Sequence, residues 1–189
     1  VVRTTNGPSD DRTFSIVYNG SDVVLYYSDD PESTSAWSAV GTVKAGTTYP
    51  SSSLVWDETN NVLYLVYARE TSSDNTNSDV FYKRVDGLDG ASCNDSASNC
   101  DIGTERIALD ASATQNFTAP MVEIAQDSST TKVFVFGTRH TDAANPSAFS
   151  VRSGTINSDN PTWDTVYAPK TWTAAANAGL YGVARVNTN

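Results

Sequence analysis

The feature that most constrains the fold is a stretch of sequence that occurs twice. It runs from Pro50 to Arg84 and returns from Pro120 to Arg152, about 70 residues later. Each copy alternates short apolar runs with turns rich in Ser, Thr, Asn and Asp. This pattern predicts three strands in the first of the two copies: Ser53–Trp56, Val62–Arg69 and Val80–Arg84. Repeats of this size, made of short antiparallel strands, are typical of the blades of a β-propeller.

Similar patterns before and after the duplicated stretch extend the series. We expect residues 1–189 to form one all-β unit, a β-propeller segment of several antiparallel blades. The blade copies cover residues 12–45, 49–110, 118–170 and, in part, 174–189. Three copies and a remnant are too few to close most rings. We therefore expect an incomplete ring or a fragment of a larger propeller, with a β-sandwich as the alternative.

The first copy is expected to contain a tight hairpin. Phe14–Tyr18 and Val23–Ser28 have the composition of strands, and the Asn19-Gly20 pair between them is a strong hairpin signal. These strands correspond to the second and third strands of the later copies. Trp37–Val40 then supplies the outer strand of this copy, and Glu105–Leu109 supplies that of the next.

The chain is strongly acidic, with a formal charge of −10 and a pI near 4.3. Nucleic-acid binding needs clustered Lys and Arg to neutralise phosphates, so we expect no nucleic-acid partner. No apolar run approaches the length that spans a bilayer, so we expect no membrane span. The sequence begins at Val1 without Met and stops after a strand-like run, so we expect a processed or excised segment of a longer protein.

The two cysteines of the chain, Cys93 and Cys100, lie in one loop of small polar residues. We predict a disulfide between them, because two free thiols in an exposed loop are a liability, and a disulfide implies an oxidising compartment. Three acceptor tripeptides for N-glycosylation point in the same direction: they begin at Asn19, Asn94 and Asn116. We therefore expect a secreted or cell-surface glycoprotein.

Several apolar runs of the second copy resemble a known group of proteins. Leu54–Asp57, followed by Val62–Tyr67 and Phe81-Tyr82, resembles a blade of the sialidase-like propellers, the superfamily of BNR or Asp-box repeats. The resemblance covers about residues 13–170 at the level of the blade pattern. It implies a β-propeller fold and, in catalytic members of the superfamily, hydrolysis of glycosides.

A degenerate Asp-box supports the same resemblance. Blades of this superfamily often carry Ser-x-Asp-x-Gly-x-Thr-Trp on the turn between the third and fourth strands. The segment Tyr27–Trp37 resembles it at Ser28, Asp30 and Trp37, but lacks the glycine and has two extra residues. Residues 159–163 resemble it more weakly. In such boxes the Asp caps a turn and the Trp packs beneath it, so the resemblance implies a structural role for the motif.

A catalytic sialidase, as the resemblance implies, would need an arginine triad, a Tyr nucleophile paired with a Glu, and an Asp acid/base. We could not assign this set, and Arg3 stands in Val-Arg-Thr-Thr where the family has Arg-Ile-Pro. Arg69 and Arg139 occupy equivalent strand ends, where a guanidinium can bind a carboxylate. A structural repeat also produces equivalent arginines, so we lean away from catalysis; if the chain is an enzyme, we expect a sialidase-like exo-glycosidase.

Two further side chains are candidates for ligand binding. Glu123 lies within an apolar strand, where it would face the central channel of a ring, although a lone Glu in a strand more often points to water. His140, the single histidine, follows Arg139 into a polar loop, so no multi-histidine metal site is expected. We expect no cofactor, with calcium as the alternative at three residues with alternating oxygen ligands: Asn75, Asn77 and Asp79.

These observations favour a non-catalytic β-propeller module with a structural or ligand-binding role, glycan binding included, in a larger extracellular protein. The expected partners are a glycan or a protein at the cell surface and other segments of the same protein. One alternative is a part of a sialidase-like glycoside hydrolase whose catalytic residues lie partly outside this segment. Another is a subunit of an extracellular assembly, in which unfinished sheet edges pair with a second chain.

Overall fold

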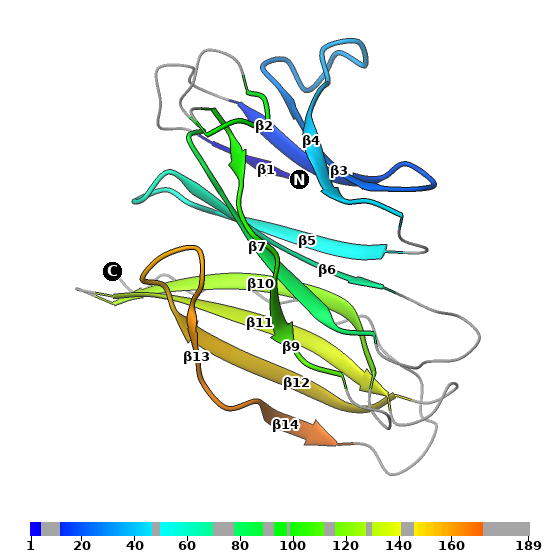
Figure 1. Cartoon of the computed structure of the whole chain (residues 1–189), viewed down its shortest axis with the longest axis vertical. Coiled ribbons are helices and arrows are strands. Elements are labelled where there is room, and N and C mark those ends of the chain that lie inside the picture. Colours follow the sequence, from blue (N-terminus) through cyan, green and yellow to red (C-terminus); the bar gives the residue numbers. More distant parts are fainter. Residues whose placement is uncertain are drawn as a thin grey trace.

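Every regular element in the described part of the chain is a β-strand, as the computed structural model shows (Figure 1). The structure describes residues 1–4, 12–46, 50–69, 78–88, 93–97, 99–111, 116–127, 130–140 and 146–171. Within these ranges the side chains of residues 50, 69, 127, 140, 146, 147 and 169–171 are not described. The prediction of an all-β fold is confirmed. No helix among the described residues is long and apolar enough to cross a membrane.

The strands form three separate antiparallel sheets, each of which follows the order of the chain. Sheet 1 has the order β1-β2-β3-β4, and its strands are Val2–Arg3, Thr13–Tyr18, Val23–Ser28 and Ser38–Lys44. Sheet 2 contains β5 to β9, with bounds Pro50–Asp57, Val62–Arg69, Val80–Asp86, Asp101–Ile102 and Arg106–Leu109. Sheet 3 contains β10 to β14, with bounds Asn116–Asp127, Thr130–His140, Pro146–Thr155, Thr162–Trp163 and Tyr167–Thr171.

Sheets 2 and 3 share one connection pattern. In sheet 2 the order is β5-β6-β7, and both β8 and β9 then pair with β7. In sheet 3 the order is β10-β11-β12, and both β13 and β14 pair with β12. The two copies of the duplicated sequence therefore occupy equivalent strands of two successive sheets.

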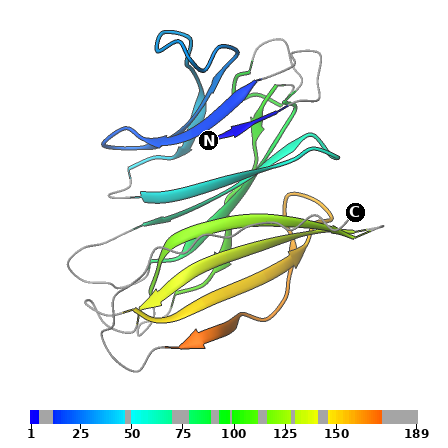
Figure 2. The same ribbon diagram turned by 180° about the vertical axis from the view of Figure 1, so that it is seen from behind.

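Sheet 2 lies between the other two sheets and is buried on both faces (Figures 1 and 2). Its strand β6 shows this most clearly, because every side chain from Val62 to Ala68 is buried. On β6, Leu63, Leu65 and Tyr67 face the core shared with sheet 1, whereas Val62, Tyr64, Val66 and Ala68 face the core shared with sheet 3. A strand without a solvent-exposed face has a continuous run of apolar residues in place of an alternating apolar and polar pattern. This explains the sequence of β6.

The three sheets approach one another mainly along their first strands. Strand β5 lies beside β10 on one side and beside β1 and β2 on the other. Hydrogen bonds join sheets 2 and 3 at both ends of this interface. At one end the amide of Ser78 donates to Asn116 Oδ1 over 3.1 Å, and at the other Thr59 Oγ1 donates to Gln126 Oε1 over 2.8 Å.

The predicted hairpin of the first copy is confirmed. Strands β2 and β3 pair up to Tyr18 and Val23, and the connection closes on Asn19. The side chain of Asn19 accepts hydrogen bonds from two backbone amides of the turn, and Gly20 has a φ of 101°. Strand β1 is an addition to the predicted copy: Val2 and Arg3 pair with β2 and supply the first strand of sheet 1.

The ring itself stays a prediction. Within the described residues none of the three sheets closes on itself, and their strand pairing fits the blades of a propeller as well as the layers of a sandwich. The fourth partial copy, at 174–189, lies outside the described residues. The division of residues 1–189 into copies at 12–45, 49–110 and 118–170 likewise remains a prediction.

The predicted disulfide between Cys93 and Cys100 is present. Both cysteines are buried in the core between sheets 1 and 2, so their packing anchors the polar loop that carries them to this core. The amide of Asp95 in this loop donates to the carbonyl of Val40 on β4 over 3.0 Å. The loop therefore links the outer strand of sheet 1 to sheet 2.

We predict that the double substitution Cys93→Ala/Cys100→Ala lowers the free energy of unfolding by about 2–4 kcal/mol. The bridge closes a loop with a sequence separation of 7, and even short loops of this kind restrict the unfolded chain by that order of free energy. Urea unfolding of both proteins measures the difference. A reducing agent should lower the urea midpoint of the wild-type protein and leave that of the variant unchanged. Equal midpoints for the variant and the oxidised wild type would contradict the prediction.

Candidate functional site

The structure does not gather the predicted ligand-binding residues into one site. Arg69 and His140 end strands β6 and β11, and their side chains are not described. Arg139 is half-buried on β11, opposite Phe117 of β10. Glu123 is half-buried on β10, opposite a position of β11 that lies five residues, or roughly 16 Å, from Arg139. Glu123 and Arg139 thus belong to different parts of sheet 3.

The predicted glycosylation sites differ in exposure. Asn19 and Asn94 are exposed, and each lies in a turn stabilised by its own side chain. Asn116 is only 5% exposed, and its side-chain oxygen accepts the amide hydrogen of Ser78. A glycan on Asn116 would have to displace the contacts between sheets 2 and 3. Asn19 and Asn94 remain the accessible acceptors.

No group of three or more His, Cys, Asp or Glu side chains among the described residues could hold a metal ion. Of the predicted calcium ligands, Asn75 and Asn77 lie outside the described residues. The third, Asp79, accepts the amide hydrogen of Ala111 over 2.6 Å. Burial raises the pKa of Asp79, and this hydrogen bond opposes the rise. The calcium alternative stays a prediction.

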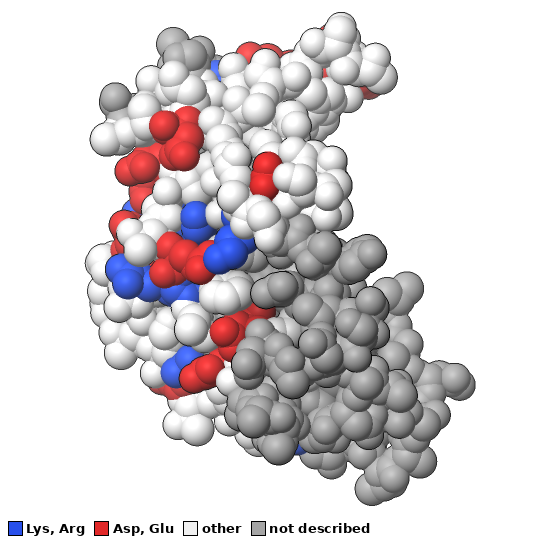
Figure 3. Space-filling model, turned by 45° about the vertical axis from the view of Figure 1, so that its right-hand side comes forward, with Lys and Arg blue, Asp and Glu red and all other residues white. Residues whose placement is uncertain are grey.

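A tyrosine and a glutamate meet at the interface between sheets 1 and 2. The hydroxyl of Tyr67 on β6 donates a hydrogen bond to Glu105, which lies just before β9. Lys44 of β4 binds the same carboxylate, with its Nζ 2.9 and 3.0 Å from the two oxygens. The Lys44 ammonium also lies 4.9 Å from the centre of the Phe81 ring. Figure 3 shows that Lys, Arg, Asp and Glu side chains are interspersed on the face it depicts.

The protonation states of Tyr67 and Glu105 suit a structural hydrogen bond better than a tyrosine nucleophile. Tyr67 is 2% exposed, and burial, together with Glu105, raises the pKa of its hydroxyl, so the phenol stays protonated. Burial also acts to raise the pKa of Glu105, but the hydrogen bonds from Tyr67 and Lys44, with the charges of Lys44 and Lys83, outweigh it and lower the pKa. The result is a carboxylate held between two sheets by a phenol and an ammonium.

Two arginines make comparable links. Arg12, 2% exposed, donates through Nε to Asp29 over 3.0 Å and through Nη1 to the carbonyl of Leu88, which lies just after β7 of sheet 2, over 3.2 Å. Arg152 of β12 donates to the carbonyl of Ala108 on β9 over 3.0 Å, so it links sheets 3 and 2. Its guanidinium lies 5.4 Å from the Trp163 ring centre. Each of these cations is held by protein groups across an interface.

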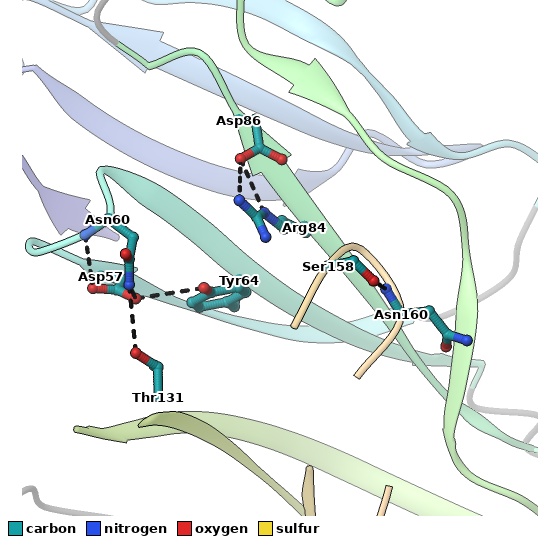
Figure 4. A network of polar contacts seen from close by, with 8 residues as sticks. All are labelled: Asp57, Asn60, Tyr64, Arg84, Asp86, Thr131, Ser158 and Asn160. Atoms are coloured by element: carbon teal, nitrogen blue, oxygen red, sulfur yellow. Dashed lines mark hydrogen bonds and ion pairs between the residues drawn. The ribbon is translucent and has the colours of Figure 1, made fainter. Parts of the chain in front are cut away.

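Between sheets 2 and 3, beside the turn that joins β5 to β6, lies a polar cavity of about 380 Å³ that is open to solvent on one side. Two turns and four strands contribute to it. Sheet 2 provides one wall and sheet 3 provides the other. The lining residues are Asn60, Tyr64, Arg84, Thr130, Thr131, Thr155, Ile156 and Asn157. Figure 4 shows Asn60, Tyr64, Arg84 and Thr131 of this lining together with neighbouring polar residues.

A buried carboxylate fixes the sheet 2 wall. Asp57 is 1% exposed and accepts hydrogen bonds from the amides of Thr59 and Asn60, each over 3.1 Å, and from Asn60 Nδ2 over 2.7 Å (Figure 4). The Tyr64 hydroxyl lies 3.4 Å from the same carboxylate. Asn60 Nδ2 also lies 3.4 Å from Thr131 Oγ1 across the cavity. The turn is therefore held in one conformation by its own first residue.

Arg84 supplies the cationic group of the cavity. Its Nε and Nη2 donate to one oxygen of Asp86 over 2.9 and 2.6 Å, and its third nitrogen, Nη1, points away from Asp86 (Figure 4). Burial lowers the pKa of Arg84, but the hydrogen bonds and charge of Asp86 outweigh burial and raise it. The guanidinium stays charged, and its charge is compensated locally.

Sequence reasoning did not find this cavity or the Tyr67–Glu105 pair. Arg84 aligns with Arg152 in the repeat, but Arg84 lines a cavity whereas Arg152 links two sheets. Lys44 and Glu105 are 61 residues apart, so no local pattern predicts their contact. The threonines and asparagines of the cavity carry no distinguishing signal in a chain whose turns are full of them.

Comparisons of the chain with protein-family models, with curated proteins and with solved structures found no match.

We predict that Glu105→Gln destabilises the protein by about 1 kcal/mol at pH 7. The pKa of Glu105 lies below its ordinary value of 4.5 in the folded chain. Its stabilising contribution is therefore present above about pH 4.5 and is lost as the pH falls through the lower folded pKa. Urea unfolding at a series of pH values measures the difference between wild type and variant, which should shrink as the medium becomes acidic.

The matched control for this measurement is Glu32→Gln, which changes an exposed glutamate between β3 and β4. This substitution should leave the unfolding free energy nearly unchanged. A Glu105→Gln variant that is as stable as wild type at pH 7, or a difference that grows with acidity, would show that the carboxylate does not stabilise the interface.

Proposed function

We propose that the chain is a non-catalytic β-propeller module with a structural and ligand-binding role in a larger secreted or cell-surface protein. The observation that carries the proposal is the stacking of three successive antiparallel sheets whose first strands lie closest together. Blades that fan out from a common axis approach one another in this way. In the sandwich alternative, two sheets would cover each other across their whole width.

The chemistry of the interfaces supports a structural role. Tyr67, Glu105, Arg12 and Arg152 are the kinds of residue that catalytic sites use. Here Glu105, Arg12 and Arg152 are hydrogen-bonded across sheet interfaces, and Tyr67 donates its hydroxyl hydrogen to Glu105. The Tyr67–Glu105 pair has the residue types of a sialidase nucleophile and its partner. Its tyrosine is closed off from solvent and has a raised pKa, which is the opposite of what an activated nucleophile needs.

The disulfide supports the proposed location. Bridges such as Cys93–Cys100 persist in oxidising compartments and are rare in the reducing cytosol. The exposed Asn19 and Asn94 tripeptides offer glycan acceptors in such a compartment. A glycan or a protein at the cell surface is the partner class that this location favours.

Single-particle electron microscopy of the native protein that contains this chain tests the architecture. We predict a ring in which the sheets radiate from one axis, with β1, β5 and β10 innermost. The same purified protein should not hydrolyse a fluorogenic sialoside. Hydrolysis that disappears in the variants Arg69→Ala and Arg139→Ala would overturn the non-catalytic role. A single closed two-sheet sandwich would overturn the propeller.

A further inference from the structure

We infer that the cavity between sheets 2 and 3 binds a small neutral carbohydrate of one or two rings. The inference deepens the ligand-binding part of the proposed function and rests on it for the extracellular setting. The cavity of about 380 Å³ lies within the range of about 300–1,000 Å³ that is usual for small-molecule sites. It lies beside the turns 57–62 and 155–162, whereas Arg69 and Arg139 lie towards the opposite ends of their strands.

The lining groups match a ligand with many hydroxyls. Five residues around the cavity carry a hydroxyl or a primary amide, groups that both donate and accept hydrogen bonds: Asn60, Thr130, Thr131, Thr155 and Asn157. A ligand that satisfies such a lining must itself present closely spaced donors and acceptors, as a sugar ring does. Ile156, which is half-buried, adds apolar surface against which the C–H groups of a sugar can pack.

The charges around the cavity favour a neutral ligand. The Arg84 cation is compensated by Asp86, with which it shares two hydrogen bonds. The Asp57 carboxylate is already bound by two amides of its own turn and by the Asn60 side chain. An anionic ligand would be repelled by Asp57, by Asp86 and by the net charge of −10 of the chain. A cationic ligand would be repelled by Arg84.

The binding groups are fixed before a ligand arrives. Asn60 Nδ2 is held between Asp57 and Thr131, which leaves its oxygen as an acceptor. Arg84 is held in plane by Asp86, and its Nη1 points away from that carboxylate (Figure 4). On the other wall, Asn157 Nδ2 lies 3.4 Å from Thr162 Oγ1. Groups that are already ordered lose little conformational entropy on binding, so even a small ligand can be held.

The test is a titration of the isotopically labelled chain with three methyl glycosides, of glucose, galactose and N-acetylglucosamine, followed by amide NMR. We expect saturable shifts in the millimolar range for at least one glycoside, confined to amides near Asn60, Thr131 and Ile156. Asn157→Ala should weaken the affinity about fivefold, which corresponds to the loss of one hydrogen bond of about 1 kcal/mol. Arg84→Gln should weaken it by at least as much.

The control variant is Ser38→Ala, an exposed position on β4 of sheet 1, which should bind as wild type does. Glucuronate serves as the charged counterpart of glucose and should bind more weakly. The inference is overturned if none of the glycosides shifts these amides, if binding survives unchanged in a folded Asn157→Ala variant, or if glucuronate binds and the neutral sugars do not. If electron microscopy shows no ring but the chain still binds the glycosides, the propeller proposal is overturned and the proposal of a carbohydrate site is not.

Discussion

The burial of both faces of sheet 2 is the constraint on which the rest of the structure depends. Strand β6 contributes Leu63 and Leu65 to one core and Val62 and Val66 to the other. Neither neighbouring sheet can be removed without exposing half of this strand to water, at a cost of about 25 cal/mol for each Å² of apolar surface. The three sheets are therefore a cooperative stack.

Polar groups fix how these apolar faces align. Apolar packing alone tolerates sliding of one sheet over another, whereas hydrogen bonds require a particular register. Glu105 joins Tyr67 of sheet 2 to Lys44 of sheet 1, and Arg152 joins sheet 3 to the carbonyl of Ala108 in sheet 2. The Cys93–Cys100 loop adds a covalent fastening between sheets 1 and 2.

The parts of the fold that sequence reasoning predicted correctly are those with a local cause. Strand β6 was predicted with its observed bounds, because an unbroken apolar run from Val62 to Ala68, followed by Arg69, stands between two polar segments. The Cys93–Cys100 bridge followed from two cysteines in one loop. Strand β1 was missed because two residues cannot show a period.

The candidate site could not be predicted for a different reason. Its walls come from sequence segments about 70 residues apart, Asn60 and Arg84 on one side and Thr131 and Asn157 on the other. Each of these residues is ordinary in its own turn or strand, and only the packing of sheet 3 on sheet 2 brings them together. A cavity between repeats is a property of their spacing, which the internal similarity of two copies does not reveal.

Methyl NMR with a soluble paramagnetic agent tests the stacked arrangement most directly. The methyl groups of Leu63 and Leu65 report on the face towards sheet 1, and those of Val62 and Val66 report on the face towards sheet 3. We expect both sets to show negligible relaxation enhancement, with the exposed Val17 as the accessible reference. Strong enhancement of either set, with Val17 behaving as expected, would mean that one face of sheet 2 meets water and would contradict the account.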